Sequence, residues 1–156
     1  MTTQTYTSTP SMSSSKATTD TRGSLLRRVL YANVAFSVAS ASLFFFAGEQ
    51  VATFLGIADT MIFDMINGTS FISILSIGLA IFALDVLFVA TRKPLNVNYA
   101  WMVAIADFIW VALSWILLAT GAIPFSDAGN WAVLLIADVV LMFGIIEVVS
   151  IRRINR

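Results

Sequence analysis

Four stretches of the chain are almost continuously apolar, and short polar segments separate them. Each contains about twenty residues, and at about 1.5 Å per residue a helix of that length crosses a hydrocarbon core of about 30 Å. Backbone groups in hydrocarbon must be satisfied within the segment, so the stretches are predicted to be helices. The predicted spans are residues 29–48, 70–91, 99–120 and 131–151.

The connections between these spans are short and contain turn residues, namely Asn67-Gly68, Pro94 and Pro124. Short connections make neighbouring helices antiparallel. The predicted fold class is therefore all-α: an integral membrane protein in which residues 24–156 form an antiparallel bundle of four transmembrane helices.

The first 23 residues are mostly Ser and Thr and carry few large apolar side chains. Such a segment cannot bury enough surface to fold, so residues 1–23 are predicted to be a disordered cytoplasmic tail. An organelle transit peptide is the alternative, because the stretch is rich in hydroxyl groups, but it lacks the repeated arginines of that class. We expect the first span to stay uncleaved, since its apolar run continues past Ala39-Ser40-Ala41, which resembles a signal-peptidase site.

The composition agrees with a lipid solvent: 58% of the residues are hydrophobic, only 12% are charged, and the mean hydropathy is +0.88. Cysteine and histidine are both absent, which excludes disulfides, thiol nucleophiles and ordinary zinc sites. No phosphate-binding glycine loop or serine with a nearby base is present, and no basic block suggests nucleic acid. We expect no enzymatic activity, no cofactor and no metal centre, although carboxylates alone can bind a hard cation.

The charges are unevenly distributed, although the nine basic and nine acidic residues give a net charge of zero. In a model with four spans, all the basic residues fall on one side of the membrane, and the other side holds acidic residues only. The positive-inside rule then predicts that both termini are cytoplasmic. We expect a multi-pass protein of the cell's inner membrane, with an organelle membrane as the less favoured alternative. The basic residues are Lys16, Arg22, Arg27, Arg28, Arg92, Lys93, Arg152, Arg153 and Arg156.

Four carboxylates lie inside the predicted spans, where each one costs about 2.5–3.5 kcal/mol if it is placed centrally. Counting about 1.5 Å per residue from the middle of each span places Asp85, Asp107 and Glu147 in the cytoplasmic half, together with Asn33 of the first helix. Each helix thus supplies one polar residue to this half. We expect these four residues to form a shared polar layer.

The spans contain no Lys, Arg or His that could neutralise this layer. Its carboxyl groups are expected to be protonated, hydrogen-bonded to one another or paired with a bound cation. One interpretation is a proton- or cation-coupled transporter or channel that uses Asp85, Asp107 and Glu147. The favoured interpretation is a hydrogen-bonded core that fixes helix packing in a non-enzymatic membrane component, such as an accessory or oligomeric subunit.

Asp138 does not fit the same layer. It precedes Glu147 by nine residues, which places the two side chains on opposite faces of an ideal helix. Both cannot point to the centre of one bundle. Asp138 is therefore predicted to face a partner membrane protein or another copy of the chain.

Several of these features resemble a family of small uncharacterised bacterial membrane proteins with four transmembrane helices. The resemblance covers residues 25–153 and includes Asn33, the stretch from Ala83 to Lys93, and the pattern Asp107-x-x-Trp110-x-x-x-Ser114. It implies a fold and a bacterial type of membrane but no chemistry. Small multidrug transporters have the same helix count, but this chain lacks their central glutamate in the first helix.

Overall fold

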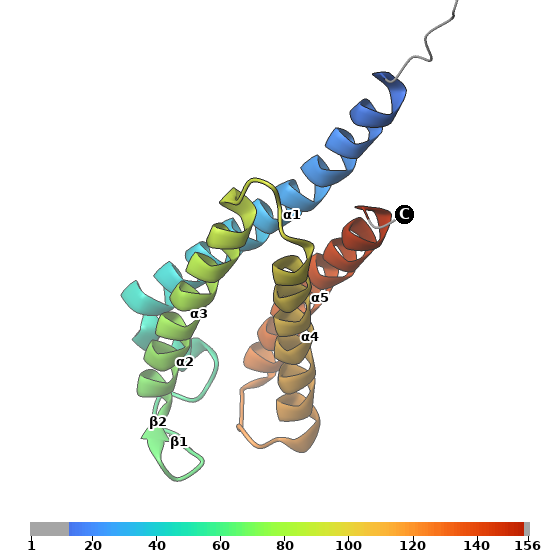
Figure 1. Cartoon of the computed structure of the whole chain (residues 1–156). Coiled ribbons are helices and arrows are strands. Elements are labelled where there is room, and N and C mark those ends of the chain that lie inside the picture. Colours follow the sequence, from blue (N-terminus) through green and yellow to red (C-terminus); the bar gives the residue numbers. More distant parts are fainter. Residues whose placement is uncertain (1–12, 155–156) are drawn as a thin grey trace, which may run out of the picture.

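The computed structural model describes residues 13–154, and within them the chain forms five α-helices and one two-stranded hairpin (Figure 1). Two of the helices and the hairpin belong to the first half of the chain, and three long helices follow. The elements are α1 (Ser13–Phe46), α2 (Gly48–Phe54), β1 (Met61–Ile62), β2 (Ile66–Asn67), α3 (Gly68–Thr91), α4 (Val97–Thr120) and α5 (Asp127–Ile154).

Four of these helices are long and apolar enough to cross a membrane: α3, α4, α5 and the part of α1 from Ser24 to Phe46. The four predicted spans each lie within one of them, apart from the last two residues of the first span. The prediction of a helical chain with four helices long and apolar enough to span a membrane is thus confirmed. Apolar side chains of every long helix point outward, including Phe45, Ile81 and Met142. Such side chains suit lipid better than water.

Helix α1 starts earlier than the sequence analysis predicts. Residues 13–23 were assigned to a disordered tail, whereas the structure continues α1 back to Ser13. The rest of that predicted tail, residues 1–12, lies outside the described residues.

The long helices pack in the order α3, α1, α5, α4. Helix α1 packs along both α3 and α5, and α5 packs along α4, whereas α3 and α4 touch each other little. Figure 1 shows α3 and α4 diverging from the connection that joins them. The start of α5 and the hairpin lie at the opposite end from that connection. A side chain on α1 can therefore reach α5, but α3 and α4 are largely kept apart.

The connection between α1 and α3 is more ordered than a simple loop. Helix α2 ends in a Schellman motif: Gly56 takes a left-handed φ of 77° and the Ile57 N–H donates to the Ala52 carbonyl at 2.9 Å. The β1–β2 hairpin follows, with Phe63 and Asp64 at positive φ in its turn. Asn67, predicted as a turn residue, caps α3 by accepting a hydrogen bond from the Ser70 N–H at 2.8 Å.

Two glycines let the backbone pack tightly at this end of the molecule. A Cβ atom added to Gly68 would lie 1.9 Å from the Ile57 carbonyl oxygen, and one added to Gly129 would lie 2.7 Å from the Leu55 carbonyl oxygen. Ser126 ties the same place together, because its hydroxyl donates to the Phe54 carbonyl at 3.0 Å and accepts from the Gly129 N–H at 3.0 Å. We call the end of the molecule opposite the α3–α4 connection, formed by residues 48–72 and 121–129, the outer cap.

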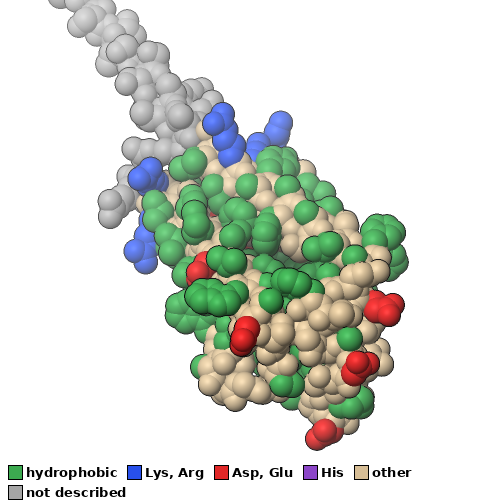
Figure 2. Space-filling model, turned by 180° about the vertical axis from the view of Figure 1, so that it is seen from behind, with side chains coloured by type: hydrophobic (Ala, Val, Ile, Leu, Met, Phe, Trp, Pro, Cys, Tyr) green, Lys and Arg blue, Asp and Glu red, His purple; other side chains and the backbone are tan. Residues whose placement is uncertain are grey.

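Apolar side chains are buried at both ends of the helices. One cluster includes Leu26, Leu30 and Ile151, and the other lies in the outer cap and includes Ile57 and Ile72. Figure 2 shows the basic side chains gathered at one end and most of the acidic side chains on the other half. We call these the basic end and the acidic end.

Candidate functional site

A buried cluster of polar side chains joins three of the four long helices. The Asn33 amide nitrogen on α1 donates to Oδ2 of Asp107 on α4 at 2.8 Å and to Oε1 of Glu147 on α5 at 3.2 Å. The Ser37 hydroxyl lies 3.4 Å from Asn33 Oδ1 and donates to it. Asn33, Asp107 and Glu147 are at most 2% exposed. We call these three residues the polar cluster.

Each member of the polar cluster lies on the packed face of its helix because of its spacing from buried neighbours. On α1, Leu30, Asn33 and Ser37 follow one another at intervals of three and four residues, and all three are buried. On α5, Gly144 precedes Glu147 by one turn. A Cβ atom added to Gly144 would lie 3.5 Å from Asp107 Cβ, so the glycine brings α4 and α5 close together beside the cluster.

The hydrogen bonds satisfy the amide better than they satisfy the carboxyls. An asparagine amide has two N–H donors, and here one donor is available to each carboxyl group. The second oxygen of Glu147, Oε2, is buried and has no hydrogen-bond partner among the residues that the structure describes. Residues 29–91 and 94–151 contain no Lys, Arg or His. A proton or a small cation is the remaining way to neutralise two acids in such surroundings.

The structure brings together three of the four residues expected in the polar layer and leaves out Asp85. This residue is exposed on α3, whose packed face carries Val86, Val89 and Ala90 instead. Because α1 packs between α3 and α5, a side chain on the outer face of α3 cannot reach Glu147. Asp85 instead shares its face with Phe88, and the Arg92 guanidinium carbon lies 4.0 Å from the Phe88 ring centre.

Asp138 is exposed on α5, whereas Glu147 is fully buried on the same helix. This placement agrees with the opposite faces that the spacing predicts. Nothing in the part of the chain that the structure describes covers Asp138, so its expected partner stays a prediction.

Two interhelical hydrogen bonds lie outside the predicted polar layer. Ser76 of α3 is buried, and its hydroxyl donates to the Ala41 carbonyl of α1 at 3.1 Å. A lone serine in an apolar span was the only available signal. Arg27 donates to the Arg92 carbonyl at 3.0 Å, which ties α1 to the end of α3. No sequence pattern predicts that contact.

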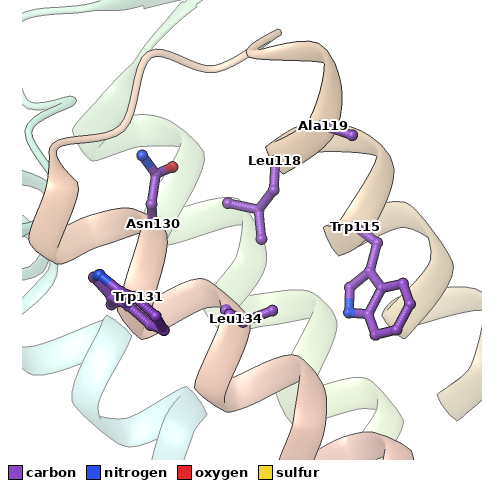
Figure 3. Close-up of a pocket in the computed structure, with 6 residues that line it drawn as sticks. All are labelled: Trp115, Leu118, Ala119, Asn130, Trp131 and Leu134. Carbon is purple, nitrogen blue, oxygen red and sulfur yellow. The ribbon is translucent and has the colours of Figure 1, made fainter.

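Two open surface hollows lie at the acidic end, and neither is lined by the polar cluster. The larger, about 510 Å³, lies between the end of α4 and the start of α5 (Figure 3). Trp115 and Trp131 stand on its two sides, with Leu118 and Leu134 between them. The other hollow, about 430 Å³, follows the outer face of α2 beside Glu49 and Phe54. The mainly apolar lining of the larger hollow suits a lipid chain or a partner's side chain.

Within residues 13–154, no group of three or more acidic side chains is arranged to hold a metal ion. No protein-family model, curated protein or solved structure matches this chain. The resemblance to small bacterial membrane proteins therefore stays an expectation.

Proposed function

We propose that this chain is a non-enzymatic membrane component that acts as an accessory or oligomeric subunit, and that its polar cluster fixes how the helices pack. The observation that carries the proposal is the pair of hydrogen bonds from the Asn33 amide to Asp107 and Glu147. One side chain of α1 thereby holds both α4 and α5. Interhelical hydrogen bonds of this kind stabilise and align transmembrane helices.

The surroundings of the polar cluster support a packing role. One turn toward the basic end from Asn33 and from Glu147, the apolar side chains of Leu30 and Ile151 are completely buried. The second apolar cluster lies in the outer cap. The polar cluster is thus a local interruption of an apolar interior, which is the arrangement expected of a device that sets helix register.

We further propose an inner-membrane location with an antiparallel four-helix bundle and both termini in the cytoplasm. The basic side chains at one end, among them Arg28, Lys93 and Arg152, support this orientation, because basic residues are retained on the cytoplasmic side. The outer cap would then face the opposite compartment.

A second candidate function is proton- or cation-coupled transport through the polar cluster. It is favoured by Glu147 Oε2, which is buried and lacks a hydrogen-bond partner within residues 13–154. Intramembrane acids that lack a compensating base are often proton carriers. In this candidate Asp107 and Glu147 bind the ion, and Asp85 would act as a separate exposed acid on α3.

Replacing Asp107 with Asn distinguishes the two candidates. The packing proposal expects the Asp107→Asn variant to unfold more readily in mixed detergent micelles, and expects no ion flux from either form in proteoliposomes. If the variant assembles and unfolds like the wild type but abolishes a pH-dependent flux, the packing proposal is wrong and the transport candidate replaces it.

Asp85→Asn is the matched control, because it makes the same chemical change on an exposed face. The packing proposal expects it to leave the unfolding midpoint close to that of the wild type. Equal destabilisation by the two variants would show that the loss comes from removing any intramembrane charge, and would contradict the specific role of the polar cluster.

A further inference from the structure

Asp138 is an acidic side chain exposed at membrane depth on the outer face of α5. It follows Trp131 by seven residues, so it lies about 10 Å along the helix from that residue. The nearest basic residue along α5 is Arg152, about 21 Å away in the other direction. An ionisable group at this depth needs a partner, and the described residues of α5 supply no base close to Asp138.

Asp85, the other exposed acid in a span, differs in this respect. It lies six residues before Thr91, the last residue of α3. The Arg92 guanidinium is folded back over the Phe88 ring on the same face as Asp85. Asp85 therefore has a cation of its own chain nearby, together with Lys93 at the same end. Along the described helix α5, Asp138 has no such neighbour, although both residues are exposed aspartates within long apolar helices.

The surface around Asp138 has the form of a helix-packing face. The exposed residues recur at intervals of four and three, which gives one stripe along most of α5. Asp138 is the only charged member of that stripe. The members are Trp131, Leu135, Asp138, Met142, Ile145 and Val149.

The hollow in Figure 3 adjoins the same stripe. Trp131 and Leu134 line it. Asp138 follows Trp131 by seven residues and Leu134 by four, so its side chain points in a direction between the side chains of Trp131 and Leu134. A long side chain that approaches Asp138 from the acidic end can therefore lie along an apolar groove. Lysine and arginine bury their stems in this way.

We propose that the α5 stripe binds a transmembrane helix of a partner protein that carries a Lys or Arg at the depth of Asp138. The proposal rests on the accessory-subunit function and specifies the chemistry of the partner. Charge complementarity selects this occupant, because a basic side chain neutralises the carboxylate in hydrocarbon. A second copy on a two-fold axis would bring two aspartates together and offer no base.

The test measures energy transfer in phosphatidylcholine liposomes between the labelled chain and a synthetic transmembrane helix. The chain has no cysteine, so Asn98→Cys, an exposed position at the basic end, takes a single label. The probe is a Leu/Ala helix with one Lys about 10 Å from one end of its apolar stretch. The same helix with Leu in place of that Lys is the reference probe.

The expected result is that the Lys probe associates at least about tenfold more strongly than the Leu probe. Asp138→Asn should reduce this preference to less than about twofold, and Asp85→Asn should retain it. Equal association of the two probes, or the same loss with Asp85→Asn, would overturn the proposal. So would Asp138-dependent dimers that show no preference for the Lys probe, because a second copy would then be the occupant.

This experiment and the test of the proposed function can fail independently. The first measures binding at the lipid-facing side of α5, and the second measures unfolding and flux after a change in the buried polar cluster. If Asp107 proves to be a transport residue while the Lys preference persists, the proposed function is wrong and the binding surface stands.

Discussion

The polar cluster and the outer cap hold helices together by different means. In the polar cluster, one amide of Asn33 joins two buried carboxyl groups by side-chain hydrogen bonds. In the outer cap, Gly68 and Gly129 let one backbone approach another at distances that no side chain permits. The polar cluster depends on hydrogen bonds between side chains, whereas the close contacts of the outer cap depend on the absence of a side chain. Substitutions should therefore affect the two regions in different ways.

The largest effect is expected from Gly68→Ala in the outer cap. The added methyl group would lie 1.9 Å from the Ile57 carbonyl oxygen, which belongs to the backbone and cannot rotate away. We expect a loss of about 3 kcal/mol or more in the free energy of unfolding. Detergent-titrated unfolding in mixed micelles, followed by circular dichroism, measures it. A loss below about 1 kcal/mol would mean that the backbone contact is not tight.

A smaller loss of stability is expected from Asn33→Leu in the polar cluster. The change removes the amide from both carboxyl groups and leaves them buried without that donor. We expect a decrease of about 1–3 kcal/mol in the free energy of unfolding. The control is Ala32→Leu, the exposed neighbouring position, which should be nearly neutral. If the two variants unfold alike, the contribution of the amide is negligible.

Ser126→Ala tests the hydrogen bonds of the outer cap separately from its close backbone contact. The Ser126 hydroxyl both donates to the Phe54 carbonyl and caps α5 at the Gly129 N–H. Its loss should lower the free energy of unfolding by about 1 kcal/mol, as for other helix caps. Ser126→Thr keeps the hydroxyl and should recover most of that stability, measured by the same titration. A Thr variant as unstable as the Ala variant would argue against the capping role.

The smallest effect, and one of opposite sign, is expected from Gly78→Ala. Gly78 is exposed within α3, and a Cβ atom added there meets nothing within 4 Å. Alanine should stabilise the helix by about 0.5–1 kcal/mol, because glycine loses more backbone entropy on folding. Set beside Gly68→Ala, this variant separates the steric effect of a methyl group from helix propensity. Destabilisation at Gly78 would reveal a contact that the single chain does not show.

The sequence analysis predicted the helices and most of the polar cluster for the same reason. Apolar segments of membrane length can form little except helices, and polar residues within them must avoid lipid. Asn33, Asp107 and Glu147 could thus be grouped by depth and by face. Depth also groups Asp85 with them, but depth does not determine which face of α3 the side chain occupies. The packed face of α3 is centred near Val86 and Ala90, one and five residues later, so Asp85 is turned away from it.

The outer cap could not be predicted in the same way. Its helix α2 and hairpin are short, and their positions depend on contacts between residues far apart in the sequence, such as Gly129 with Leu55. Nothing local distinguishes Gly68, which is packed against a backbone carbonyl, from Gly78, which is exposed. The early start of α1 at Ser13 was missed because a segment rich in Ser and Thr gives a weak helical signal.

A double-mutant cycle between Asn33 and Asp107 tests the central claim most directly. The free energy of unfolding is measured for the wild type, Asn33→Leu, Asp107→Leu and the double variant in the same mixed micelles. Because the two side chains are joined at 2.8 Å, the account predicts a coupling energy of about 1 kcal/mol or more. A coupling energy of zero within error would contradict the claim that the polar cluster holds these helices together.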